Sequence, residues 1–179
     1  NQELYKKEPL QVALASAEKS IVLLKNDGVL PLGKDKKILV LGELANSRRE
    51  LHGNWAADGT AEHTKTILES LTELYDVDYI AGFGIRNFDK KALSNTAVNW
   101  AKYDSIIVVA GESFIETGEA AAKTNISLSD AQKAALSFIL QKKVPTVLLL
   151  VNGRPLVLGK EIAEQCSAFV ECWQLGIMA

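Results

Sequence analysis

The chain has 179 residues, of which 47% are hydrophobic and 23% are charged, as in an ordinary folded domain. Its 20 basic and 22 acidic residues give a net charge of −2, which argues against nucleic acid as the main partner, because phosphate binding needs clustered positive charge. No apolar run reaches the roughly 18 residues needed to cross a membrane. Cys166, Cys172, His52 and His63 match no metal-binding spacing. We therefore expect neither a membrane span, nor a metal, nor a cofactor.

The first predicted element is a helix over residues 9–24, which ends before a turn at residues 26–28. Pro9 suits the first turn of a helix and Gly28 suits the position just after its end.

Five short apolar runs follow, rich in β-branched residues. They occupy residues 37–42, 77–81, 105–110, 146–151 and 168–173. Each is typical of a strand that is buried on both faces of a parallel sheet.

Helical spacing separates these runs. One helix is predicted to begin near Thr60 and another at Ser129, where Ser129 and Gln132 have the spacing of a capping box. Weaker helical patterns cover residues 89–102 and 156–165.

Alternating strands and helices predict an α/β fold, with a doubly wound, mostly parallel sheet of five or six strands and helices on both faces. We expect residues 1–36 to form the opening helix and its connection, and residues 37–179 to form an α/β sandwich domain. The chain stops just after its fifth predicted strand, without a closing helix, so we expect the domain to be truncated at its C-terminus.

Ligands of such sheets bind beyond the carboxyl ends of the strands, where the strand order reverses. A 2-1-3-4-5 order would place the loops after the first and third strands at this point. They cover residues 43–59 and 112–128 and are the two longest loops, a length that is usually functional or disordered.

The second of these loops carries Glu112, Glu116 and Glu119 together with Lys123. Two carboxyl groups, one protonated and one ionised, perform acid–base and glycosyl-transfer chemistry, although a solvated acidic loop is the plainer interpretation. The first loop carries Trp55, which is either a platform for a sugar ring or a plug of the core.

Five segments, taken together and in order, resemble glycoside hydrolase family 3. They are residues 15–32 (ASAEKSIVLLKNDGVLPL), 38–55 (ILVLGELANSRRELHGNW), 111–128 (GESFIETGEAAAKTNISL), 144–158 (VPTVLLLVNGRPLVL) and 168–176 (AFVECWQLG). The resemblance is to the second, C-terminal α/β sandwich domain of the periplasmic β-glucosidase branch, and it implies a periplasmic or secreted protein.

The resemblance implies a retaining enzyme for β-linked glucosides or oligosaccharides. Its active site would lie between this domain and an N-terminal barrel domain that is absent here and that carries the aspartate nucleophile. Glu119, in TGEAAAKT, falls on the general acid/base of the family, with Glu112 and Glu116 as rivals. Trp55 falls on a tryptophan near the aglycone, and Lys123 on a substrate-binding arginine.

Departures from the family leave alternatives open. Lys123, Thr124 and Asn125 stand where the family usually has Arg, then Thr or Ser, then Asp, and lysine lacks the planar fork of arginine. The domain could be non-catalytic, shaping the sugar site or holding the barrel. A flavodoxin-like ligand-binding domain is a further alternative, although only Gly42 follows the first strand. For the isolated chain we expect a poorly ordered loop 112–128, because only three apolar side chains anchor it, and an exposed Glu119.

Overall fold

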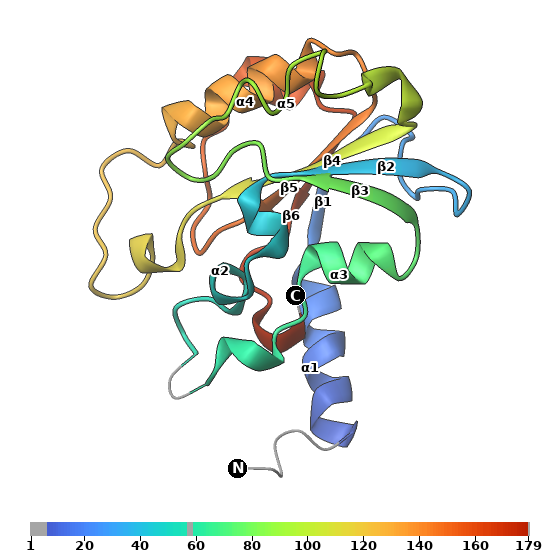
Figure 1. Cartoon of the computed structure of the whole chain (residues 1–179). Helices are drawn as coiled ribbons and strands as arrows, with labels where there is room; N and C mark the ends of the chain where they lie inside the picture. The colour runs from blue at the N-terminus through green and yellow to red at the C-terminus, as the bar shows by residue number, and fades with distance from the viewer. Residues whose placement is uncertain (1–6, 57–58, 179) are drawn as a thin grey trace.

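The computed structural model describes residues 7–56 and 59–178. A single sheet has α4 and α5 on one face and α2 and α3 on the other, while α1 extends away from the sheet (Figure 1). The strands are β1 (Val22–Asn26), β2 (Lys37–Leu41), β3 (Asp76–Ile80), β4 (Ser105–Gly111), β5 (Thr146–Val151) and β6 (Ala168–Glu171). The helices are α1 (Lys7–Ser20), α2 (Arg48–His52), α3 (Ile67–Thr72), α4 (Asp130–Leu140) and α5 (Lys160–Gln165).

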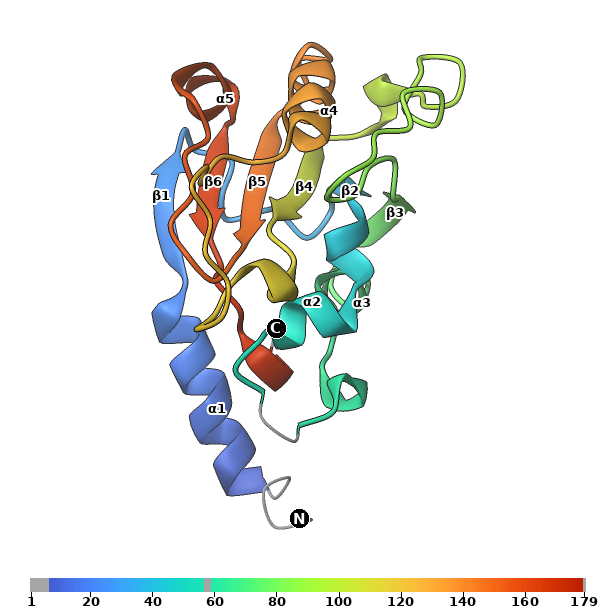
Figure 2. The same cartoon turned by 90° about the vertical axis from the view of Figure 1, so that its left-hand side faces the viewer.

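The strand order is β1-β6-β5-β4-β2-β3, and Figure 2 shows β1 and β3 at the two edges. The strands from β2 to β6 pair in parallel, and β1 pairs with β6 in the antiparallel sense. Numbered among themselves, the parallel strands have the predicted 2-1-3-4-5 order. The predicted fold class is confirmed.

The central strand β4 is buried along its whole length. Ile106 and Val108 point into one core, which contains α4 and α5, whereas Ile107 and Val109 belong to the core on the other face. Alternating side chains of one apolar strand therefore serve both cores, as expected for a sheet that is covered on both sides.

The opening helix ends at Ser20, four residues before the predicted end, because Val22–Asn26 forms the edge strand β1. Val22 faces Glu171 and Leu23 faces Val170 across the antiparallel pair. The partner strand lies about 150 residues away in the sequence, so no local pattern could reveal the pairing. The domain division at residue 37 stays a prediction.

The helix predicted from Thr60 begins only at Ile67. Thr66 accepts a hydrogen bond from the Glu69 N–H, and the Glu69 carboxylate accepts one from the Thr66 N–H, so a capping box fixes this start. At α4 the box is only half formed. Ser129 accepts from the Gln132 N–H, but the buried Gln132 side chain does not return the bond.

The weak helical pattern over residues 89–102 was wrong except for a 3₁₀ turn at Trp100–Lys102. The Asp89 carboxylate accepts hydrogen bonds from the N–H groups of Lys91 and Ala92, as at a helix N-cap, but only turns follow it. The pattern over residues 156–165 becomes a helix only from Lys160, after Gly159 at a positive φ of 84°.

Gly42 connects β2 to the first long loop at a φ of 104°. A Cβ atom there would lie 2.3 Å from the Val109 carbonyl oxygen, in the backbone of the neighbouring strand β4. Only glycine combines this left-handed φ with such a close approach of two backbones.

We predict that Gly42→Ala lowers the free energy of unfolding by about 3 kcal/mol, from backbone strain plus the clash with β4. Gly28→Ala is the matched control, because Gly28 has a φ of 93° but nothing within 4 Å of its Cβ position. Its expected loss is about 1 kcal/mol. Urea unfolding of both variants measures the difference, and equal losses would contradict the clash.

Candidate active site

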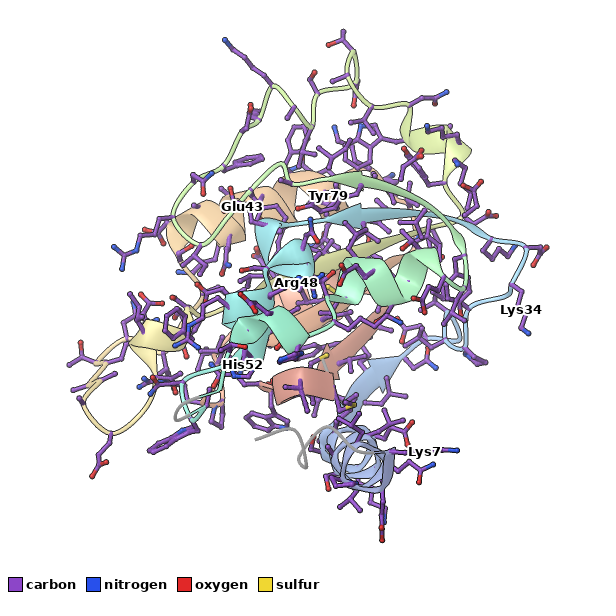
Figure 3. All side chains as sticks on the ribbon, turned by 60° about the horizontal axis from the view of Figure 1, so that its bottom comes forward. Lys7, Lys34, Glu43, Arg48, His52 and Tyr79 are labelled. Atoms are coloured by element: carbon purple, nitrogen blue, oxygen red, sulfur yellow. The ribbon has the colours of Figure 1, made fainter. Side chains whose placement is uncertain are left out.

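The two long loops lie side by side beyond the carboxyl ends of β2 and β4. The first contains a 3₁₀ turn, Glu43–Asn46, and then α2. Figure 3 labels Arg48 and His52 on α2, and both bond to the segment before α3: Arg48 donates to the Thr64 carbonyl, and His52 Nδ1 lies 2.9 Å from Thr64 Oγ1. Burial and the charge of Arg49 lower the pKa of His52. Residues 57 and 58 of this loop lie outside the described residues.

Glu112 directly follows β4, and only 2% of its side chain is exposed. Its Oε1 lies 2.7 Å from Lys123 Nζ, and its Oε2 lies 3.3 Å from Arg154 Nε, an ion pair without hydrogen-bond geometry. Arg154 lies in the turn after β5, and its charge balances that of Glu112 after the neighbouring strand β4. A buried carboxylate is tolerated because it is paired in this way.

Glu116 is half-buried and also contacts cations. Its carboxylate lies 3.7 Å from Lys123 Nζ and 3.3 Å from Arg86 Nη2. Its carbonyl oxygen accepts a hydrogen bond from Arg154. Glu116 therefore holds the loop with both its side chain and its backbone.

Glu119 is exposed, as expected for the isolated chain. Among the described residues, its side chain has neither an ion pair nor a hydrogen bond. A backbone hydrogen bond of 3.2 Å from the Ala121 N–H to the Gly118 carbonyl closes a turn around it. Of the three candidate acids, Glu119 alone has a carboxyl group that no cation of the described chain engages.

The second loop has a defined conformation, contrary to the expectation of disorder. The Glu50 carboxylate accepts from Ser113 Oγ at 3.0 Å and from the Phe114 N–H at 2.6 Å, and the Arg49 guanidinium lies 4.0 Å from the centre of the Phe114 ring. Asn54 Nδ2 donates to the Thr117 carbonyl at 2.9 Å. Counting only apolar anchors omitted these polar contacts, which offset the entropy of ordering the loop.

Trp55 is 73% exposed, which rules out the core plug and leaves its ring free to stack on a ligand. It follows Asn54, and Glu119 follows Gly118, whose Cβ position lies 1.9 Å from Asn54 Nδ2. The structure thus brings Trp55 and Glu119 to two neighbouring loop tips.

A cavity of about 240 Å³ opens beside the ion-pair cluster, lined by Glu112, Glu116, Lys123 and Arg86 among others. Trp55 and Glu119 do not line it. Three basic and three acidic side chains are among the residues that line it. Within residues 7–56 and 59–178, no group of three metal-ligating side chains occurs.

Sequence reasoning missed Glu50 and Asn54, the residues that join the two loops. Their partners lie 63 or 64 positions away in the sequence, so only the strand order brings them together. The sequence offered only a weak signal for these contacts, namely that both polar side chains belong to the first loop, which was predicted to lie beside the second.

Residues 21–179 match the model of the glycosyl hydrolase family 3 C-terminal domain. The chain belongs to glycoside hydrolase family 3. The match begins directly after α1 and includes every strand, so the family domain contains the antiparallel strand β1 and the site described above.

Similar proteins are named as a β-glucosidase and a β-xylosidase. The chain is 34% identical to the periplasmic β-glucosidase of Salmonella typhimurium, over 97% of this chain and 25% of that protein. It is 30% identical to the β-xylosidase of Formosa agariphila, over 96% of this chain and 25% of that protein. The chain thus spans about a quarter of the length of these relatives.

A solved structure of the β-glucosidase from Listeria innocua, in complex with isofagomine, has a TM-score of 0.89 and 31% identity to this chain. The match covers 99% of this chain and 25% of that one. The strands and loops of this chain are therefore arranged as in the matching quarter of that β-glucosidase. Within the part of the chain that the structure describes, no helix is long and apolar enough to cross a bilayer.

The buried ion pair predicts a difference between two lysines that line the same cavity. Lys123→Met would leave Glu112 with only Arg154 as a cation, at a cost of about 2 kcal/mol of stability. Lys133→Met removes an exposed pair with Asp130, worth less than about 0.5 kcal/mol. Urea unfolding compares the two, and an equal effect would show that the Glu112 pair does not stabilise the loop.

Proposed function

We propose that this chain is the second domain of a retaining β-glucosidase and that Glu119 is its general acid/base. The exposed, unpartnered carboxyl group of Glu119, at the sheet edge where α/β domains bind ligands, carries the proposal. The names of the relatives support the β-glucosidase class, and the chain's share of their length supports a further domain in the same polypeptide.

The contacts of the three acids favour Glu119 over its rivals. A general acid must hold a proton when substrate binds and must regain it in each cycle. Protonation of Glu112 would leave Lys123 and Arg154 without their counter-charge inside the protein. Glu116 has a similar tie to Lys123 and Arg86. Glu119 exchanges a proton without breaking any contact of the described chain.

In the proposed mechanism, an aspartate of a preceding barrel domain attacks the anomeric carbon while Glu119 gives its proton to the departing glycosidic oxygen. Glu119 then removes a proton from the water that releases the sugar from the aspartate. Burial of Glu119 against the sugar and the barrel would favour its protonated form before the first step.

Two further residues have proposed roles. Trp55 presents its ring to the sugar or the aglycone from the neighbouring loop. The resemblance places Lys123 among the substrate contacts, but its ammonium group lies 2.7 Å from Glu112. This contact favours a role in holding the loop that carries Glu119. The periplasm is the proposed location, by similarity to the Salmonella relative.

A non-catalytic domain that only shapes the sugar site is the second candidate. The observation in its favour is that no described residue orients the Glu119 carboxyl group. A flavodoxin-like binder of phosphate is disfavoured, because Glu43 stands directly after Gly42 at the turn where a phosphate would bind.

We predict that Glu119→Gln in the full-length enzyme lowers kcat/KM by about 100-fold or more for glucosides with poor leaving groups. Azide should restore part of the turnover on an activated aryl glucoside, because it replaces the water that needs a general base. Release of the aglycone measures both effects.

The matched comparison is Glu116→Gln in the same loop, which should lose less activity than Glu119→Gln and respond little to azide. A full loss in Glu116→Gln together with an active Glu119→Gln enzyme would move the acid/base to Glu116. Activity in both variants would favour the non-catalytic candidate.

The isolated chain should not hydrolyse aryl β-glucosides above background, because the proposed nucleophile lies in another domain. Purified chain and its Glu119→Gln variant, assayed side by side, give the comparison. Turnover by the chain that the substitution abolishes would place the whole catalytic machinery within these 179 residues.

A further inference from the structure

At the tip of the second loop, residues 117–121, hydrogen bonds hold the backbone. The side chain of Glu119, the proposed acid, makes no hydrogen bond or ion pair with the described residues. Gly118 and Ala121 close the turn that contains Glu119. Just before this turn, the Thr117 carbonyl accepts the 2.9 Å hydrogen bond from Asn54 Nδ2. Just after Glu119, Arg154 Nη2 lies 3.5 Å from the Ala121 carbonyl.

Asn54 reaches Thr117 only because Gly118 leaves room for it. Gly118 has a φ of 108°, and a Cβ atom there would lie 1.9 Å from Asn54 Nδ2. The backbone of Asn54 is also held in place. Its amide nitrogen donates to Gln174 Oε1 over 3.4 Å, and Gln174 lies beyond the end of β6. The side-chain amide of Asn54 therefore connects the first loop to the backbone of the second loop, close to Glu119.

We infer that Asn54 is a positioning residue for the acid/base, setting the place of Glu119 relative to the ring of Trp55. Trp55 is the residue after Asn54, and Glu119 is two residues after Thr117. One hydrogen bond thus connects the segment that carries the proposed sugar platform to the backbone that carries the proposed proton donor. This inference rests on the proposed role of Glu119.

Glu50 and Arg154 do not replace Asn54 in this role. Glu50 holds Ser113 and Phe114, at the start of the loop. Arg154 holds the Glu116 and Ala121 carbonyls from the side of β5. Of the bonds among the described residues, that of Asn54 alone ties the tip of this loop to the segment that carries Trp55.

Loss of the Asn54 amide should harm proton donation more than sugar binding. A misplaced acid slows departure of a poor leaving group, whereas an activated leaving group departs without a proton. The test compares an alkyl β-glucoside with 2,4-dinitrophenyl β-glucoside in the full-length enzyme. Asn54→Ala removes the amide, and Asn54→Leu removes its hydrogen bond at nearly constant size.

Both variants should lose at least about tenfold in kcat/KM on the alkyl glucoside and less than about twofold in kcat/KM on the activated substrate. The comparison uses kcat/KM because it reports the steps up to departure of the aglycone and not the later attack of water, which also needs Glu119. Asn95→Ala is the matched control: Asn95 is an exposed asparagine whose side chain contacts Lys142, two residues after the end of α4 and away from the site. It should leave both rates unchanged. Thermal unfolding establishes whether each variant is folded. If Asn54→Ala is not folded, the rates of Asn54→Leu test the inference.

Equal losses on the two substrates, or no loss on either, would overturn the positioning role. Glu119→Gln, assayed on the same pair, separates the two proposals. If Glu119→Gln discriminates between the substrates but the Asn54 variants do not, only the inference about Asn54 fails. If Glu119→Gln does not discriminate either, the proposed acid/base is wrong and the inference fails with it.

Discussion

The buried carboxylate of Glu112 is the constraint on which the site depends. It lies at the end of the central strand β4, where water is nearly excluded, so two cations must remain beside it. Lys123 reaches it from the far side of the same loop, and Arg154 reaches it from the turn after β5. Lys123 lies eleven positions after Glu112, so this part of the loop closes on its own first residue, and the closure costs little entropy because the segment is short.

The parallel part of the fold was predictable from local patterns. Each strand from β2 to β6 is a short apolar run, and alternation with helices leaves few possible topologies. Strand β1 was not predicted, because the predicted opening helix extended to residue 24, and residues 22–26 form a strand through their pairing with β6. The capping box at Thr66 decided the start of α3, which the apolar periodicity alone placed too early.

The location of the site followed from the strand order, but its internal order did not. Expected strand ends placed the two loops together, and the exposure of Glu119 followed from the small, polar residues around it. The contacts of Glu50 and Asn54 could not be found in this way, because each joins segments more than 60 residues apart. A count of apolar anchors underestimates such a loop, since hydrogen bonds from a neighbouring loop order a backbone that buries little apolar surface.

The structure separates two requirements that an acid/base residue must meet together. Its position must be fixed, because proton transfer needs hydrogen-bond reach. Its charge must be free to change, which a fixed ion pair within the domain would prevent. In this chain the backbone on both sides of Glu119 is held, by Asn54 before it and by Arg154 after it, while its carboxyl group makes no contact with the described residues. Under the proposed function, this domain supplies the position of the acid/base, and the sugar and a partner domain supply the environment that favours its protonated form.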